Sequence, residues 1–123
     1  MNNQQLPYTF SGKVQRNLGR CRELGYPTAN ISIPLDLPDG LFVGYITVKG
    51  RRLPSLIFIG TNVTFGETDK KAEVYILDFN EDIYDEQVEV EVLKKLRDSV
   101  KFESAEKLIE QMKQDELEAR KFF

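Results

Sequence analysis

Histidine is absent from this sequence of 123 residues, and cysteine occurs once, at Cys21. Without histidine the chain has no Ser-His or Cys-His nucleophile pair, no histidine-rich zinc site and no imidazole proton shuttle. A single cysteine cannot form a disulfide within the chain, which is typical of proteins in a reducing compartment. We therefore predict a cytoplasmic protein whose acid–base chemistry depends on carboxylates, lysine or tyrosine.

Long apolar runs and a strong net charge are also missing. No segment approaches the roughly 18 apolar residues of a membrane span. The start, MNNQQLPYTF, has neither a basic nor an apolar signal region. The net charge is −3, with 41% hydrophobic and 30% charged residues, and these values are those of an ordinary globular domain. We expect neither a membrane nor a nucleic acid as a partner.

The sequence is rich in short β-type segments. Six of them follow one another with no helical pattern between them, which predicts antiparallel strands closed into a small barrel. The predicted strands are residues 8–16, 28–33, 41–49, 54–60, 72–79 and 86–96. KGRRL, residues 49–53, is expected to be a loop. We expect residues 1–7 to form a poorly ordered tail and residues 8–123 to form one domain.

A helical period begins at Ser104, which is a predicted N-cap. Glu116 precedes Arg120 by four residues, a spacing that favours an exposed ion pair. Asp115 falls on the apolar face of this helix, and we expect its carboxylate to lie at the edge of that face and accept from a loop donor. The apolar face consists of Ala105, Leu108, Ile109, Met112 and Ala119.

The common phosphate-binding signatures, G-x-x-x-x-G-K-S/T and G-x-G-x-x-G, are absent. The segment RNLGRCRELGYPTAN instead has Gly19 and Gly25 around Arg20 and Arg22. Glycine lets backbone amides approach a phosphate closely, and arginine matches phosphate oxygens. A hairpin with solvated arginines explains the same composition, so the pattern leaves both interpretations open.

Thr28 and Asn30 follow that segment at once and lie on one face of an extended strand. Two neutral oxygens suit Mg²⁺, which keeps several waters and binds substrate phosphates. A threonine that favours a strand and an asparagine that satisfies a turn form the alternative. Glu73 is in phase with Tyr75 and Phe79, and is either a strand-end carboxylate that reaches solvent or a general base in an apolar setting.

Six ordered segments carry a family resemblance: SGKV, LGYPTAN, PDGLFVGYI, FIGTNVTFG, AEVYILDFNEDIYDE and the C-terminal stretch that begins KKLRDSVKF. Together they resemble the riboflavin kinase (flavokinase) family, which in many bacteria is the C-terminal half of a bifunctional riboflavin kinase/FAD synthetase. The resemblance implies a six-stranded antiparallel Greek-key β-barrel with a C-terminal α-helix. It also implies Mg²⁺-dependent transfer of the ATP γ-phosphate to the 5′-hydroxyl of riboflavin, giving FMN and ADP.

The resemblance also implies residue roles. By this resemblance, Glu73 would be the base that takes the proton of the ribityl hydroxyl, and Thr28 and Asn30 would hold Mg²⁺ and the nucleotide phosphates. Arg97 and Phe102 would face the flavin. The segment around ATP includes Gly12, Gly19, Arg20 and Arg22. Aromatic or apolar surface for the flavin ring is expected from Tyr75, Phe79, Tyr84, Leu96 and Phe102.

Several positions depart from the family pattern. Asn17 and Cys21 stand where glycines are common, Asn62 and Val63 where arginine and proline are frequent, and Phe58 where asparagine is usual. They leave open a catalytically impaired flavin-binding or regulatory module with the same fold. A nucleic-acid-binding barrel is a third possibility because of five arginines, but the acidic balance of the chain argues against it. Those arginines are Arg16, Arg20, Arg22, Arg51 and Arg52.

Overall fold

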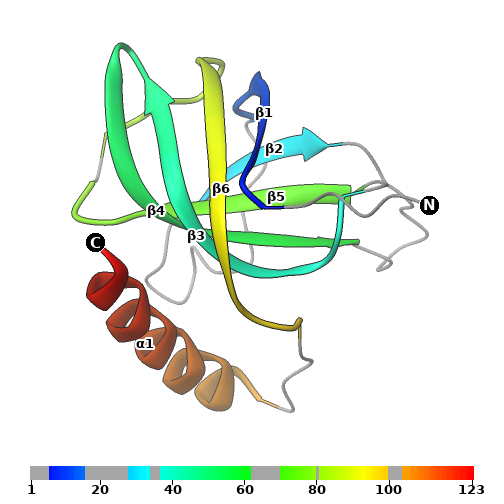
Figure 1. Ribbon diagram of the computed structural model, residues 1–123, viewed down its shortest axis with the longest axis vertical. Helices are drawn as coiled ribbons and strands as arrows, with labels where there is room; N and C mark the ends of the chain where they lie inside the picture. The colour runs from blue at the N-terminus through cyan, green and yellow to red at the C-terminus, as the bar shows by residue number, and fades with distance from the viewer. Residues whose placement is uncertain (1–5, 16–27, 34–36, 62–69, 80, 100–103) are drawn as a thin grey trace.

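The computed structural model describes residues 6–15, 28–33, 37–61, 70–79, 81–99 and 104–123. Its strands are β1 (Tyr8–Lys13), β2 (Ala29–Ile33), β3 (Gly40–Val48), β4 (Arg51–Thr61), β5 (Lys70–Ile76) and β6 (Gln87–Arg97), followed by helix α1 (Ala105–Phe122). All strand pairs are antiparallel, in the order β1-β6-β3-β4-β5-β2 (Figure 1). The predicted fold of six antiparallel strands in a barrel with a C-terminal helix is confirmed.

The two ends of the sheet meet where β1 approaches β2. The backbone N–H of Gln15 donates to the carbonyl of Asn30 at 2.8 Å, and its side-chain amide donates to the Ser32 hydroxyl at 2.7 Å. At Gly12 an added Cβ would lie 2.8 Å from Cγ2 of Ile31, closer than two carbon atoms can pack. Glycine at this position therefore allows the barrel to close almost completely.

The expectation of a loop at residues 49–53 is wrong, because β4 begins at Arg51 and pairs with Val48. A two-residue turn joins β3 to β4, with φ of 52° at Lys49 and 76° at Gly50, as in tight hairpins. Arginine stays in a strand here because its long side chain lies over neighbouring strands. The Arg52 guanidinium lies 3.7 Å from the centre of the Tyr45 ring and binds Glu91 through two nitrogens.

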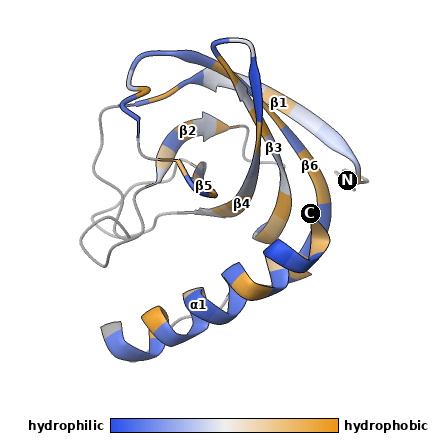
Figure 2. Ribbon diagram, turned by 90° about the vertical axis from the view of Figure 1, so that its left-hand side faces the viewer, coloured by the Kyte–Doolittle hydropathy of each residue, from blue (hydrophilic) through white to orange (hydrophobic). Residues whose placement is uncertain are grey.

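Strand alternation creates two separate apolar layers. Inside the barrel lie residues such as Val88, Val90 and Val92 of β6, all 2% exposed or less, as their alternation with glutamates predicts. On the outer face a second cluster forms where α1 packs against the sheet (Figures 1 and 2). It comprises Leu41, Val43, Leu56 and Ala119, with partly buried Phe58, Tyr75 and Leu96.

Helix α1 has the predicted cap and the predicted ion pair. The Ser104 hydroxyl accepts a hydrogen bond from the Lys107 backbone at 3.2 Å, and Arg120 binds Glu116 at 2.9 Å. The expected loop donor to Asp115 is wrong, because its principal donor is Arg97, the last residue of β6. Over the part of the chain that the structure describes, no helix is long and apolar enough to cross a membrane.

Candidate active site

One row of paired residues crosses five strands of the barrel. Arg97 on β6 pairs with Leu41, which pairs with Phe58; Phe58 pairs with Glu73, which pairs with Asn30 on β2. Because paired residues in antiparallel strands point to the same face, the whole row lies on the outer face. Arg97 and Glu73 are three strand spacings apart, about 14 Å. Three residues predicted from separate motifs therefore share one surface.

Thr28 lies immediately before β2 and brings its hydroxyl oxygen close to the Glu73 carboxylate. Its hydroxyl donates a hydrogen bond to Oε1 of Glu73 at 3.3 Å. Thr28 and Asn30 are 9% and 3% exposed, whereas Glu73 is half-buried. Since the Thr28 hydroxyl is the donor in this hydrogen bond, its lone pairs remain available to a cation. The structure thus brings together the three residues at which the sequence predicts the metal site and the base.

The chemistry of these donors fits Mg²⁺. The Thr28 hydroxyl and the Asn30 amide oxygen are hard oxygen ligands, and Mg²⁺ usually binds one or two protein groups plus substrate phosphates and waters. No group of three or more His, Cys, Asp or Glu side chains suited to a metal occurs among the described residues. An ion bound here would therefore rely on the phosphates of a nucleotide for the rest of its ligands.

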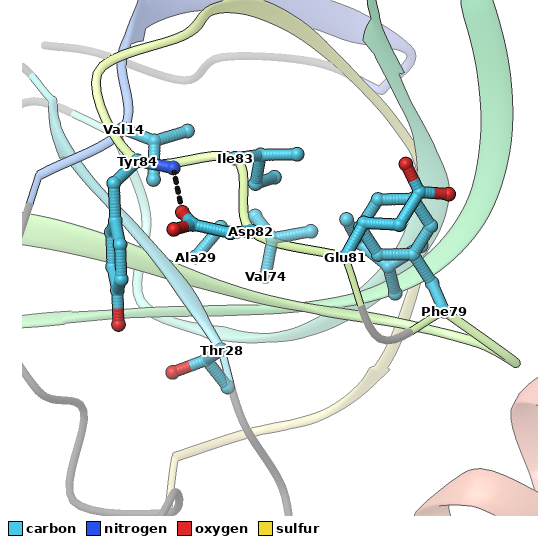
Figure 3. A pocket seen from close by; sticks show the side chains of 10 residues that line it. Val14, Thr28, Ala29, Val74, Phe79, Glu81, Asp82, Ile83 and Tyr84 are labelled. Carbon is cyan, nitrogen blue, oxygen red and sulfur yellow. Dashed lines mark hydrogen bonds between the residues drawn. The ribbon is translucent and has the colours of Figure 1, made fainter.

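A cavity of about 260 Å³ opens beside Thr28. Figure 3 shows Phe79 and Glu81 on one side of it, Tyr84 on the other and Thr28 at its edge. Its lining consists of Val14, Thr28, Ala29, Val74, Ile76, Phe79, Glu81, Asp82, Ile83 and Tyr84. The lining is largely apolar, with a few oxygens at the rim, which suits a flat ring with polar substituents.

Three contacts hold the connection between β5 and β6, which forms part of the cavity wall. The Tyr84 backbone N–H donates to Oδ1 of Asp82 at 3.0 Å, which fixes a tight turn in that connection. On the other side, the Arg51 guanidinium lies 5.3 Å from the Phe79 ring centre and binds Glu81 at 2.8 Å. Arg51, which was predicted to lie in a loop, therefore supports one side of the cavity.

The riboflavin kinase (Flavokinase) family model matches residues 4–123. The chain belongs to the riboflavin kinase family.

Relatives agree with this membership. The chain is 38% identical over 121 residues to the bifunctional riboflavin kinase/FMN adenylyltransferase of Listeria monocytogenes, covering 95% of the chain but only 38% of the relative. It is 35% identical over 125 residues to the riboflavin kinase of Homo sapiens, covering 94% and 81% respectively. A crystal structure of riboflavin kinase from Trypanosoma brucei superimposes with a TM-score of 0.72 at 26% identity, covering 98% of this chain and 79% of that one.

The residues that the resemblance assigns to the flavin surface lie in two separate places in the structure. Phe79 and Tyr84 line the cavity, whereas Tyr75 and Leu96 pack into the outer cluster. Phe58 was not predicted as a site residue, yet it pairs directly with Glu73. Sequence alternation alone places Phe58 on one face of its strand, but its position beside Glu73 depends on the register between β4 and β5.

Arg97, expected to face the flavin, holds an ion pair with Asp115 of α1. Gly12 lies at the seam between β1 and β2, so its predicted part in nucleotide binding stays a prediction. The remaining predicted binding residues lie outside the described part of the chain, and their roles stay predictions; they are Gly19, Arg20, Arg22 and Phe102. The departures at Asn17, Cys21, Asn62 and Val63 also lie outside it.

Proposed function

We propose that this chain transfers the γ-phosphate of ATP to the 5′-hydroxyl of riboflavin with Mg²⁺, giving FMN and ADP. The observation that carries the proposal is the Glu73 carboxylate, which lies beside Thr28 and Asn30 on the outer face of a riboflavin kinase barrel. The chain spans 38% of the length of its bifunctional relative, and an FAD synthetase domain as its partner belongs to the same proposal. Cytoplasmic location stays a prediction from the sequence.

The geometry supports separate places for the two substrates. We place the adenine base in the cavity between Phe79 and Tyr84, where rim carboxylates accept hydrogen bonds from amino or hydroxyl groups. The flavin ring is placed on the outer face, over the partly buried Phe58 and Tyr75, in the interval between Glu73 and Arg97. Thr28 belongs to both regions, since it lines the cavity and contacts Glu73. The phosphates therefore belong at Thr28.

Each residue then has a defined part in phosphoryl transfer. The Thr28 hydroxyl and the Asn30 amide oxygen would hold Mg²⁺, which would neutralise charge on the phosphates. Glu73 accepts the proton of the riboflavin 5′-hydroxyl as that oxygen bonds to the γ-phosphorus. The bond from the γ-phosphorus to the bridging oxygen breaks, and ADP leaves. Phosphoryl transfer depends mainly on positioning and charge neutralisation, so the lack of histidine is no obstacle.

The first experiment measures FMN formed from riboflavin, ATP and Mg²⁺ by chromatography with fluorescence detection. We expect Glu73→Gln to lower kcat about 10²- to 10⁴-fold, the usual loss for a general base. Glu89→Gln, which neutralises an exposed carboxylate on β6, is the matched control and should leave kcat within twofold.

Riboflavin binding, followed by quenching of its fluorescence, separates the remaining outcomes. Binding without FMN formation by the native chain would replace the kinase with a non-catalytic flavin-binding module. Full activity of Glu73→Gln would remove Glu73 from the role of base while leaving the kinase assignment intact.

A further inference from the structure

A buried carboxylate on α1 has no part in the reaction described above. Asp115 is 3% exposed and lies on the face of α1 that carries the buried Met112 and Ala119. It accepts from Nε of Arg97 at 2.9 Å and from Nη2 at 2.7 Å, and the Gln111 side-chain amide adds a third hydrogen bond at 2.9 Å. Its side chain therefore has one fixed orientation.

Holding the helix in place does not explain this arrangement. Burial of a charge is costly, and an apolar pair of similar size often supports a fold as well or better. α1 already packs on the sheet through Ala119, and Arg120 ties its C-terminal end to Asp78 with hydrogen bonds of 2.9 and 3.0 Å. What the buried pair adds is direction, because two parallel hydrogen bonds fix the plane of a guanidinium.

The fixed guanidinium lies at the end of the proposed flavin surface that is farther from Glu73. Arg97 is the last residue of β6 and belongs to the same row on the outer face as Glu73. Its Nη1 also donates to the carbonyl of Asp98 at 3.0 Å, so the pair orders the backbone where the strand ends. Asp115 thus acts on this end of the proposed flavin surface from the neighbouring helix.

We propose that Asp115 is a positioning residue for the flavin. It orients Arg97 and the end of β6, and so sets the distance and angle between that end of the flavin surface and Glu73. The inference rests on the proposed riboflavin kinase function. A positioning role differs from a purely structural one because it predicts that loss of Asp115 raises the KM for riboflavin and leaves the KM for ATP unchanged.

The test compares KM for riboflavin and for ATP in the native chain and in Asp115→Asn, which keeps the shape and removes the charge. We expect the riboflavin KM to rise at least tenfold and the ATP KM to stay within twofold. Glu116→Gln is the matched control: it makes the same change at the next residue, whose partner is Arg120 on the exposed side of the helix. Both KM values should stay within twofold in this control.

A double variant keeps the inference testable if Asp115→Asn folds poorly. Arg97→Met with Asp115→Leu replaces the ion pair by an apolar pair, and we expect it to fold with a Tm close to the native one yet bind riboflavin at least tenfold more weakly by fluorescence quenching. Native riboflavin binding in the double variant would overturn the inference, as would parallel rises in both KM values. If the native chain makes no FMN, the proposed function itself fails and the inference fails with it.

Discussion

The interior of the barrel and its outer face are built from the same strands but hold different chemistry. On β5, Ala72 and Val74 point inward and are fully buried, while Glu73 between them points outward beside Asn30. Neighbouring residues of one strand thus belong to the core and to the proposed active site. Alternation along the strand therefore places core residues and residues of the proposed active site next to each other in the sequence but on opposite faces. Substitutions on the two faces should have separable effects on stability and on activity.

The largest expected effect comes from a substitution in the interior of the barrel. Phe42 is 2% exposed and is the largest side chain of the fully buried set. Phe42→Ala should lower the free energy of unfolding by about 3–5 kcal/mol, because it leaves a cavity in a packed core. Chemical denaturation measures the loss, and Leu117→Ala, at a residue that is 58% exposed, should change stability by less than about 0.5 kcal/mol. Equal losses in the two variants would contradict the assigned core.

A second test concerns a polar atom within the apolar core. Among the described residues, the Tyr8 hydroxyl is the buried side-chain oxygen without a hydrogen-bond partner. Burial raises the pKa of Tyr8 from 10.0 to about 12. The unfolded chain therefore loses this proton at lower pH than the folded chain, so stability is complete below pH 10 and falls as the pH rises toward 12.

The expected loss is on the order of 1–3 kcal/mol, since each unit of pKa corresponds to about 1.4 kcal/mol. Denaturation at a series of pH values between 9 and 12 measures it in the native chain and in Tyr8→Phe. The variant should lack this part of the alkaline loss. An identical pH dependence in the two proteins would show that Tyr8 is not the group responsible.

The smallest effect sharpens the contrast between the cavity and the outer face. Tyr84 lines the cavity, whereas Tyr75 packs in the outer cluster. Tyr84→Leu should raise the KM for ATP about tenfold and leave that for riboflavin within twofold, because it removes one aromatic wall of the proposed adenine site. Tyr75→Leu should do the reverse. If each variant changes the KM of the other substrate instead, the two proposed substrate positions must be exchanged.

Much of the fold can be predicted from local pattern. The alternation of Val88, Val90 and Val92 with glutamates predicts a strand with one buried face, and Ser104 predicts the start of the helix. These signals work because side-chain period and capping depend on a few adjacent residues. The start of β4 at Arg51 could not be predicted in this way, since its arginines are stabilised by contacts with Tyr45 and Phe79 on other segments.

The sequence by itself determined the six strands, the terminal helix and the ordered motifs that the riboflavin kinase family shares. Only the tertiary structure decided which strands are neighbours, and hence that Asn30, Glu73 and Arg97 lie in one row. It also decided that Asp115, an unexpected charge on an apolar helix face, pairs with Arg97. The physical reason is that periodicity records which face a residue occupies, whereas its partner depends on strand order and register, which bring together residues far apart in the chain.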